Sequence, residues 1–263
     1  MSKVKFLVIG DIPLATKVFK VLHNHPKVEV AAVLTLAKSK TFANDPWEDK
    51  TCLYDEAKKY GIKILHSQQE AVAEFSAGAF EYGISCRASI IYKPPFLNLF
   101  SKYLINMHGG ILPARSGLHI ANHCIIEGDK QSGGTLHIIN EAIDAGDLLA
   151  REFFDLESTD TSYTVYRKTQ YALFKAFEDN IDSIAEETIE AIPQSVYIAN
   201  GEKKEYFNKH AIDKRKEIDL TTISLEELDC RVRGLDFPGH ESAFTMINGN
   251  RIYLTTQRFF KPD

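Results

Sequence analysis

Features that mark several protein classes are missing from this chain of 263 residues. Its four cysteines, Cys52, Cys86, Cys124 and Cys230, lie far apart and form no Cys-x-x-Cys pair. That spacing argues against both a zinc site and a disulfide framework. We therefore expect the cysteines to be small apolar side chains of a cytoplasmic protein that uses no metal.

Long hydrophobic runs and an excess of basic residues are also missing. The apolar run in the N-terminal "MSKVKFLVIG" is too short for a signal-peptide core or a membrane span. Lys and Arg total 31 against 36 Asp and Glu, which gives a net charge of -5 and a pI of about 6.0. This balance favours neither nucleic acid nor an anionic membrane surface as a partner.

A dinucleotide fingerprint is missing as well. The first expected strand is followed by Gly10-Asp11-Ile12-Pro13 instead of G-x-G-x-x-G. An acidic side chain repels phosphate there, and a proline removes a backbone N–H donor. Both changes argue against a phosphate-binding loop at this turn.

Short apolar strands alternate with amphipathic helices through the first two thirds of the chain, and apolar residues make up 44% of it. This order is typical of an α/β protein: a Rossmann-like, mostly parallel sheet with helices on both faces. Strands are expected at residues 5–9, 28–34, 62–65, 80–85, 103–106, 135–139 and 147–154. Helices are expected at residues 13–23, 51–60, 67–75, 118–127 and 161–187.

A change in composition divides the chain into two expected domains, residues 1–190 and a small C-terminal extension at 191–263. The stretch "NGEKKEYFNKHAIDKRKEID" carries many charges and is expected to be a loop or junction. Beyond it, Ser224 and Glu227 form a capping-box pattern that predicts a short helix. Asn248-Gly249 between alternating apolar runs predicts a β-hairpin.

The stretch "NMHGGILPARSG", residues 106–117, predicts chemistry at a strand end. Residues i and i+2 of a strand point to the same side, so Asn106 and His108 are expected to project together. The carboxyl edge of an open α/β sheet is where ligands bind. An amide that donates to an oxyanion and an imidazole that accepts a proton suit acyl transfer.

A carboxylate that orients the imidazole is the group this pair still needs. The segment "NEAIDAGDLL" supplies Asp144, in a turn before Ala-Gly, and Asp147, at the start of the next strand. Taken alone, Asn106 and His108 would be ordinary strand-end residues. Agreement with the Leu-Pro and Asp-Ala-Gly-Asp stretches, in order and spacing, makes a functional site the better interpretation.

These segments resemble the formyltransferases that use N10-formyltetrahydrofolate. The resemblance lies in Asn106-Met107-His108-Gly109-Gly110-Ile111-Leu112-Pro113 and in Ile143-Asp144-Ala145-Gly146-Asp147, and it covers about residues 80–155 well. It implies that Asn106 stabilises the oxyanion, His108 acts as general base and Asp144 is the positioning carboxylate. It also implies N10-formyltetrahydrofolate as co-substrate, with no metal.

The resemblance further implies a folate pocket lined largely by main chain. Its expected residues are Arg87, Ala88, Ser89, Ile139, Asn140 and Glu141. His137 stands where relatives often carry histidine, but a hydrogen-bonded core histidine is the favoured interpretation for it.

Three branches of the family compete for the acceptor. The turn at Gly10–Pro13 argues against the purine-pathway branch, and the chain is short for the C-terminal barrel of the methionyl-tRNA branch. The C-terminal hairpin resembles the short C-terminal addition of the branch that formylates nucleotide-linked amino sugars. We therefore expect transfer to a dTDP-linked 3- or 4-amino-dideoxyhexose for surface polysaccharide (O-antigen) synthesis by a homodimer.

Other possibilities stay open at this point. A methionyl-tRNA formyltransferase, a formyltetrahydrofolate hydrolase and a non-catalytic folate-binding relative are the alternatives. Candidates for holding a diphosphate are Lys203, Lys204, Lys209 and Arg215, although such a charge run is usually a solvated surface. Trp47, Tyr206 and Phe207 are possible stacking partners for a base, but packing is the favoured interpretation for each.

Overall fold

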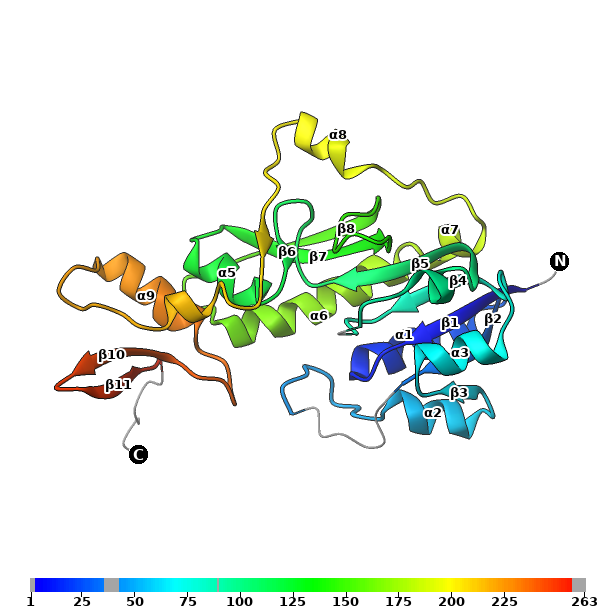
Figure 1. The fold of residues 1–263 in the computed structure, drawn as a ribbon, viewed down its shortest axis with the longest axis horizontal. Coiled ribbons are helices and arrows are strands. Elements are labelled where there is room, and N and C mark those ends of the chain that lie inside the picture. Colours follow the sequence, from blue (N-terminus) through cyan, green and yellow to red (C-terminus); the bar gives the residue numbers. More distant parts are fainter. Residues whose placement is uncertain (1–2, 36–42, 89, 257–263) are drawn as a thin grey trace.

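A computed structural model describes residues 3–35, 43–88 and 90–256 of the chain. Their central element is a seven-stranded sheet with strand order β3-β2-β1-β4-β5-β7-β8 (Figure 1). The strands from β3 to β5 pair in parallel, and β7 and β8 are antiparallel to their neighbours. The expected α/β, mostly parallel sheet is confirmed.

The strands of this sheet follow the predicted positions closely. Their bounds are β1 Val4–Ile9, β2 Val28–Leu34, β3 Lys63–Leu65, β4 Phe80–Ser85, β5 Phe100–His108, β7 Gln131–Ile138 and β8 Leu148–Asp155. β5 is longer than the predicted 103–106, so Asn106 and His108 both lie within the strand, at its carboxyl end. Antiparallel pairing with β7 extends the strand to His108, which faces Thr135.

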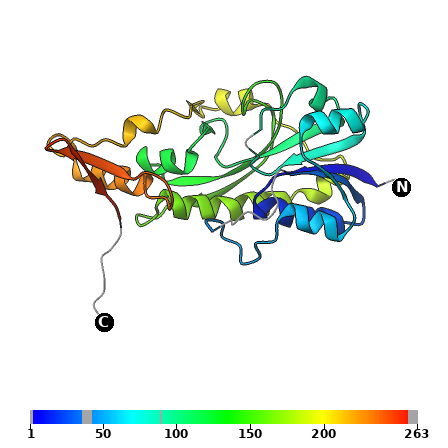
Figure 2. The same cartoon turned by 60° about the horizontal axis from the view of Figure 1, so that its bottom comes forward.

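Helices cover both faces of the sheet (Figure 2). They are α1 Pro13–Asn24, α2 Leu53–Lys59, α3 Gln68–Glu74, α4 Pro94–Leu97, α5 Ile120–Ile126, α6 Ser162–Glu178 and α7 Ile181–Ala185. Side chains alternate along β1 and therefore pack on both faces of the sheet. Phe6 and Val8 belong to the core under α1 and α6, whereas Leu7 and Ile9 belong to the core under α3 and α4. Among the described residues no helix is long and apolar enough to cross a membrane.

The single long helix predicted over 161–187 is wrong. It ends at Glu178, and a separate short helix, α7, follows. Asn180 adopts φ -119° and ψ -2° and donates its side-chain amide to the carbonyl of Ala176 at 2.8 Å. A side chain that satisfies the last carbonyls in this way competes with continuation of the helix.

The C-terminal extension contains the two predicted elements and three unpredicted ones. The helix capped by Ser224 is α9, Leu225–Gly234, and the hairpin is β10 Ala243–Ile247 with β11 Asn250–Leu254. The unpredicted elements are α8 Gln194–Ala199, which precedes the polar stretch, and β9 Tyr206–Phe207 and the 3-10 helix Asp213–Arg215 within it. β9 pairs with β6 Ser116–Gly117. Asn248 and Gly249 take φ of 50° and 77°, the left-handed backbone of a tight hairpin turn.

A small apolar cluster joins this extension to α5 of the main domain. Ile126 at the end of α5 packs with Ile218, Leu235 and Ala243. Figure 1 shows α9 and the hairpin at one end of the molecule, beyond α5. The extension therefore lies beside the segment that follows the Asn106 and His108 strand, although the expected domain boundary at 190 stays a prediction.

Candidate active site

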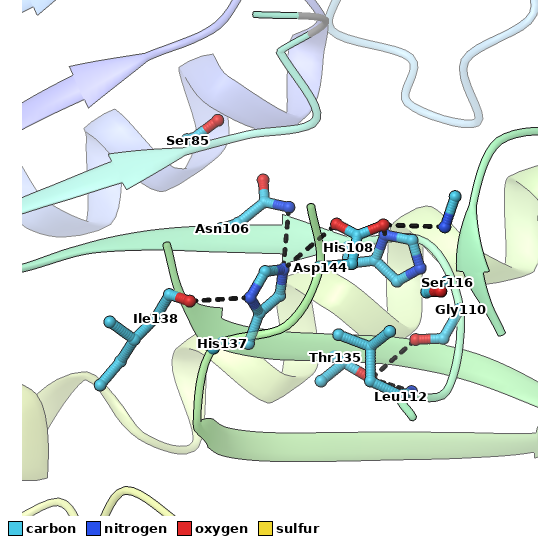
Figure 3. Close-up of polar contacts among 12 residues, drawn as sticks. Ser85, Asn106, His108, Gly110, Leu112, Ser116, Thr135, His137, Ile138 and Asp144 are labelled. Carbon is cyan, nitrogen blue, oxygen red and sulfur yellow. Dashed lines mark hydrogen bonds and ion pairs between the residues drawn. The ribbon is translucent and has the colours of Figure 1, made fainter. Parts of the chain in front are cut away.

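Four polar side chains from three segments converge at the carboxyl end of β5 (Figure 3). Asn106 and His108 come from β5, His137 from the neighbouring β7, and Asp144 from the loop that follows β7. Antiparallel register places Asn106 directly opposite His137. The structure thus brings together the three residues predicted for catalysis and adds a second histidine.

Asn106 is held by that second histidine. Its amide nitrogen Nδ2 lies 3.1 Å from His137 Nε2, and His137 Nδ1 lies 3.0 Å from the carbonyl oxygen of Ile138. A carbonyl can only accept, so Nδ1 of His137 carries the hydrogen and Nε2 accepts from the amide. This chain of bonds orients the Asn106 amide and leaves its second N–H for another acceptor.

His137 is buried and hydrogen-bonded, as the sequence favoured. Its ring also faces the site, because Nε2 lies 3.6 Å from Asp144 Oδ1. Sequence alone could not place it there, since the contact depends on the register between β5 and β7. We assign His137 a positioning role through Asn106 and Asp144.

His108 is fixed in one tautomer by the backbone. Its Nε2 lies 2.7 Å from the carbonyl oxygen of Arg115, so Nε2 carries the hydrogen and donates it. The other ring nitrogen, Nδ1, lies 3.5 Å from Asp144 Oδ2. Burial lowers the pKa of His108 and the negative charge of Asp144 opposes that effect. The net direction is downward, which keeps Nδ1 free to accept a proton near neutral pH.

Glycine makes this contact possible at position 110. A Cβ on Gly110 would stand 2.6 Å from the Arg115 carbonyl oxygen and 3.0 Å from His108 Nε2. Thr135 holds the same segment, because its hydroxyl donates to the Gly110 carbonyl at 2.7 Å and accepts from the Leu112 N–H. Gly110 therefore allows the close approach of the Arg115 backbone to His108.

Asp144 is ionised and well satisfied. It adopts left-handed backbone with φ 51°, and its Oδ2 accepts from the N–H of Gly117 at 2.8 Å. Burial would raise its pKa, but the neighbouring His137 and His108 and the Gly117 N–H outweigh burial and lower the pKa to about 2. A permanent negative charge thus stands beside Nδ1 of His108.

Gln194, which was not among the predicted site residues, supports the Asp144 loop. The side-chain amide of Gln194, at the start of α8, donates to the carbonyls of Asp144 and Gly146, both at 2.8 Å. Gly146 is needed there, since a Cβ would stand 1.8 Å from the Ile138 carbonyl oxygen. The backbone carbonyl of Asp147, the other candidate carboxylate, accepts a hydrogen bond from the N–H of Ile138.

The four residues open onto a cavity of about 680 Å³. Its lining can be divided into two groups of residues, which we call arms. The first arm consists of most of the predicted folate-binding residues, namely Arg87, Ala88, Ile139, Asn140 and Glu141. Ser89, the sixth, lies outside the described residues. Ile90 and Ile143 add apolar wall to this arm. The volume of the cavity and its mixed polar and apolar lining suit a flat heteroaromatic ligand.

The second arm consists of lining residues of the C-terminal extension and of the segment at α5. Residues from three segments line it: His119 and Asn122 of α5 and its cap, Tyr206, Lys209, Asp213 and Lys216, and Leu235, Phe237, His240 and Glu241. Lys216 is paired with Asp213 at 2.9 Å and with Glu241 at 3.2 Å. Burial and the neighbouring His240 lower the pKa of His119.

The other sequence candidates for anion binding and stacking differ in outcome. Lys209 and Tyr206 line the cavity, whereas Lys203 and Lys204 are not among the described lining residues. Arg215 pairs with Glu127 at 2.7 Å. Trp47 packs against Tyr171 and Phe174, and Phe207 stacks on His123 with ring centroids 4.1 Å apart. Within the described part of the chain no group of three His, Cys, Asp or Glu residues is placed to hold a metal ion.

Comparison with known proteins identifies formyltransferases as the similar proteins. A family model described as formyl transferase matches residues 2–181. A 4-N formyltransferase from Francisella tularensis has a similar structure, with a TM-score of 0.74, 21% identity and 96% of each chain covered. An N-formyltransferase from Helicobacter canadensis, in complex with folinic acid and dTDP-3-aminofucose, has a TM-score of 0.73 at 22% identity, over 95% of this chain and 86% of that one. At these identities the likeness shows the fold.

Similar sequences carry another name. A methionyl-tRNA formyltransferase of Bacillus velezensis is 25% identical over 206 residues, which are 75% of this chain and only 61% of that protein. The methionyl-tRNA formyltransferase of Mycoplasma capricolum is 24% identical over 268 aligned positions, with 100% of this chain and 80% of that protein covered.

Proposed function

The chain belongs to the formyl transferase family, and from this premise we propose that it formylates the amino group of a nucleotide-linked amino sugar. The formyl donor in this proposal is N10-formyltetrahydrofolate, and the acceptor is a dTDP-linked 3- or 4-amino-dideoxyhexose. The observation that carries the proposal is the meeting of Asn106, His108 and Asp144 in the lining of one cavity.

His108 is the proton acceptor in this proposal. Because Nε2 is tied to the Arg115 carbonyl, Nδ1 is the nitrogen that takes the proton of the attacking amine. Asp144 Oδ2, 3.5 Å away, stabilises the imidazolium that results. General base catalysis of this kind contributes roughly 10²–10⁴ in rate.

Asn106 stabilises the negative charge that develops on the formyl oxygen. One N–H of its amide goes to His137 and fixes the group, while the second N–H is the donor to the oxyanion. A fixed donor of this type is worth roughly 3–4 kcal/mol. Overall, a C–N bond forms between the amine and the formyl carbon, the bond to N10 breaks, and the amine proton ends on N10.

The arm at Arg87, Ala88 and Ile139–Glu141 is the proposed donor site. Main-chain groups of this arm would read the pterin edge, and the apolar side chains of Ile90 and Ile143 would cover its faces. Ser89, outside the described residues, belongs to the same proposal.

The arm in the C-terminal extension is the proposed acceptor site. A sugar nucleotide needs cations for its phosphates and an aromatic surface for its base. Lys209 supplies a cation, the ring N–H groups of His119 and His240 can donate hydrogen bonds, and Tyr206 and Phe237 supply the aromatic surface. Full-length similarity to sugar N-formyltransferase structures supports this acceptor, including the Helicobacter protein whose structure holds a dTDP-amino sugar.

Methionyl-tRNA is the second candidate acceptor, because the similar curated sequences are methionyl-tRNA formyltransferases. Against it, the chain carries a net charge of -5, which does not favour RNA. The overall charge and the acceptor arm favour the smaller substrate.

One experiment separates these candidates. The purified protein is incubated with N10-formyltetrahydrofolate and either a panel of dTDP- and UDP-linked amino sugars or methionyl-tRNA, and products are identified by mass. Addition of one formyl group to a nucleotide sugar supports the proposal. Formylation of methionyl-tRNA alone, formate release without acceptor, or no turnover would each contradict it.

Cellular role and assembly belong to the same proposal. A formylated nucleotide sugar would serve surface polysaccharide synthesis in the cytoplasm. Homodimer formation is proposed through the hairpin, whose Ile247 and Ile252 are 51% and 45% exposed. Exposed apolar side chains on a regular surface favour burial against a partner.

A further inference from the structure

Arg87 occupies a demanding position at the end of β4. Its backbone φ is 55°, a left-handed conformation that costs free energy in a residue other than glycine. The N–H of the preceding residue, Cys86, is bonded to the carbonyl of Ile9 on the neighbouring strand. Such a conformation directs the side chain into the cavity, where Arg87 is a lining residue.

The guanidinium of Arg87 lies flat against Gly109. A Cβ built on Gly109 would be 3.0 Å from Cζ and 3.2 Å from each terminal nitrogen, distances that are nearly equal only above the plane of the group. Gly109 directly follows His108, so the guanidinium stands beside the proposed reaction centre. The absence of a side chain at position 109 makes this approach possible.

Tyr166 of α6 provides a second contact. Its ring centroid lies 5.0 Å from Arg87 Cζ, within the range of a cation–π interaction. The Tyr166 hydroxyl donates to Asp45 Oδ1 at 3.3 Å. Ring and glycine together fix the guanidinium while leaving its N–H donors, which lie in its plane, at the edges of the group.

Those donors have no protein acceptor in the described part of the chain. Arg87 makes neither a hydrogen bond nor an ion pair with any residue described there, and the buried carboxylate of Asp45 acts on it only over a longer distance. Burial lowers the pKa of Arg87, the direction expected for a cation that the protein itself leaves unpaired. A fixed, partly buried guanidinium with free donors is a receptor for an oxyanion.

We propose that the Arg87 side chain binds a phosphate oxygen of the acceptor substrate, and so selects acceptors that carry an anionic group close to the amine. This role of the side chain differs from main-chain recognition of the folate and rests on the proposed function. Tyr166 connects Arg87 to the acceptor arm, because its ring packs edge-on against Phe237 at 5.4 Å. Phe237 in turn packs on His240, 5.1 Å away.

The charge of Arg87 has a second consequence. It is one of the causes that lower the pKa of His108. A nearby cation likewise disfavours protonation of the incoming amine, so binding and chemistry favour the same neutral nucleophile.

Binding of inorganic pyrophosphate to the full-length protein tests the proposal without any turnover. Calorimetry compares the unaltered protein with Arg87→Met, Arg87→Lys and the control Lys175→Met, which removes a positive charge from the exposed side of α6. We expect the unaltered protein and the control to bind alike, and Arg87→Met to bind on the order of tenfold more weakly or worse. Lysine should restore part of the affinity, because it keeps the charge but not the planar fork.

Equal affinity of Arg87→Met, or no pyrophosphate binding by the unaltered protein, would overturn the proposal. Thermal melting checks that each variant folds, and Arg87→Lys remains informative if the methionine variant does not. Where turnover is observed, Arg87→Met should raise KM for the acceptor and leave KM for the folate unchanged; the reverse pattern also overturns it. Pyrophosphate binding that depends on Arg87 would stand even if the amino-sugar panel failed, so the two proposals fail separately.

Discussion

His108 and Asp144 face each other with Nδ1 and Oδ2 3.5 Å apart, while the opposite nitrogen of the ring donates to the Arg115 carbonyl. The backbone therefore decides which nitrogen accepts a proton, and the carboxylate decides how well the resulting charge is tolerated. Both partners are nearly buried, with side-chain exposures of 8% and 10%. Water screens this pair little.

Removing the charge of Asp144 should slow turnover without breaking the loop. Asp144→Asn retains an oxygen that can accept from the Gly117 N–H, but it no longer stabilises the His108 imidazolium. We expect kcat to fall by a factor on the order of 10²–10⁴. Since Asp144 raises the pKa of His108, the acid limb of the remaining pH–rate profile should move to lower pH. Unchanged kcat and an unmoved limb would argue against the pairing.

Asp144 should also make stability depend on pH. Its pKa is lowered from 3.8 to about 2 in the folded protein, so its stabilising contribution is present above pH 4 and is lost as the pH falls from 4 to 2. The shift corresponds to about 2 kcal/mol. Urea unfolding of the wild-type protein and Asp144→Asn at several pH values should show a stability difference at pH 6 that narrows by that amount towards pH 2. A difference independent of pH would contradict the assignment.

Gln194 should matter for activity although it lies outside the reaction centre. Gln194→Ala removes both hydrogen bonds to the carbonyls of Asp144 and Gly146. We expect a stability loss of about 1–3 kcal/mol and a fall in kcat that exceeds the effect on KM, because the carboxylate loses its position. Gln131→Ala, which removes an exposed glutamine bonded to Asp155, serves as the control and should change neither.

The hairpin should control assembly if the protein is a dimer. Ile247 and Ile252 lie on the same face of the hairpin, because Thr245 pairs with Ile252 and side chains alternate along each strand. Ile252→Lys should convert dimers to monomers in light scattering after gel filtration. A monomeric wild-type protein, or a variant that remains dimeric, would count against this interface.

The sequence was informative wherever local chemistry decided the structure. Asn106 and His108 could be paired from strand periodicity alone, and the Asn248-Gly249 turn predicted its hairpin. The capping residue Ser224 accepts from the N–H group of Glu227 as predicted.

Relationships between distant segments could not be predicted in the same way. The contact of Asn106 with His137 follows from antiparallel register between β5 and β7, which one sequence does not specify. Gln194 reaches a loop fifty residues earlier in the chain, from a segment before the polar stretch for which no element was predicted. The break at Asn180 depends on one side-chain hydrogen bond winning over helix continuation.

The most direct test of the proposed chemistry is formyl transfer by His108→Ala beside the wild-type protein, on the nucleotide-linked amino sugar that gives the highest wild-type rate. The variant should melt as a folded protein and still bind the donor. We expect its kcat to fall by a factor on the order of 10²–10⁴. A folded variant that transfers the formyl group at the wild-type rate would contradict the assignment of His108 as the proton acceptor.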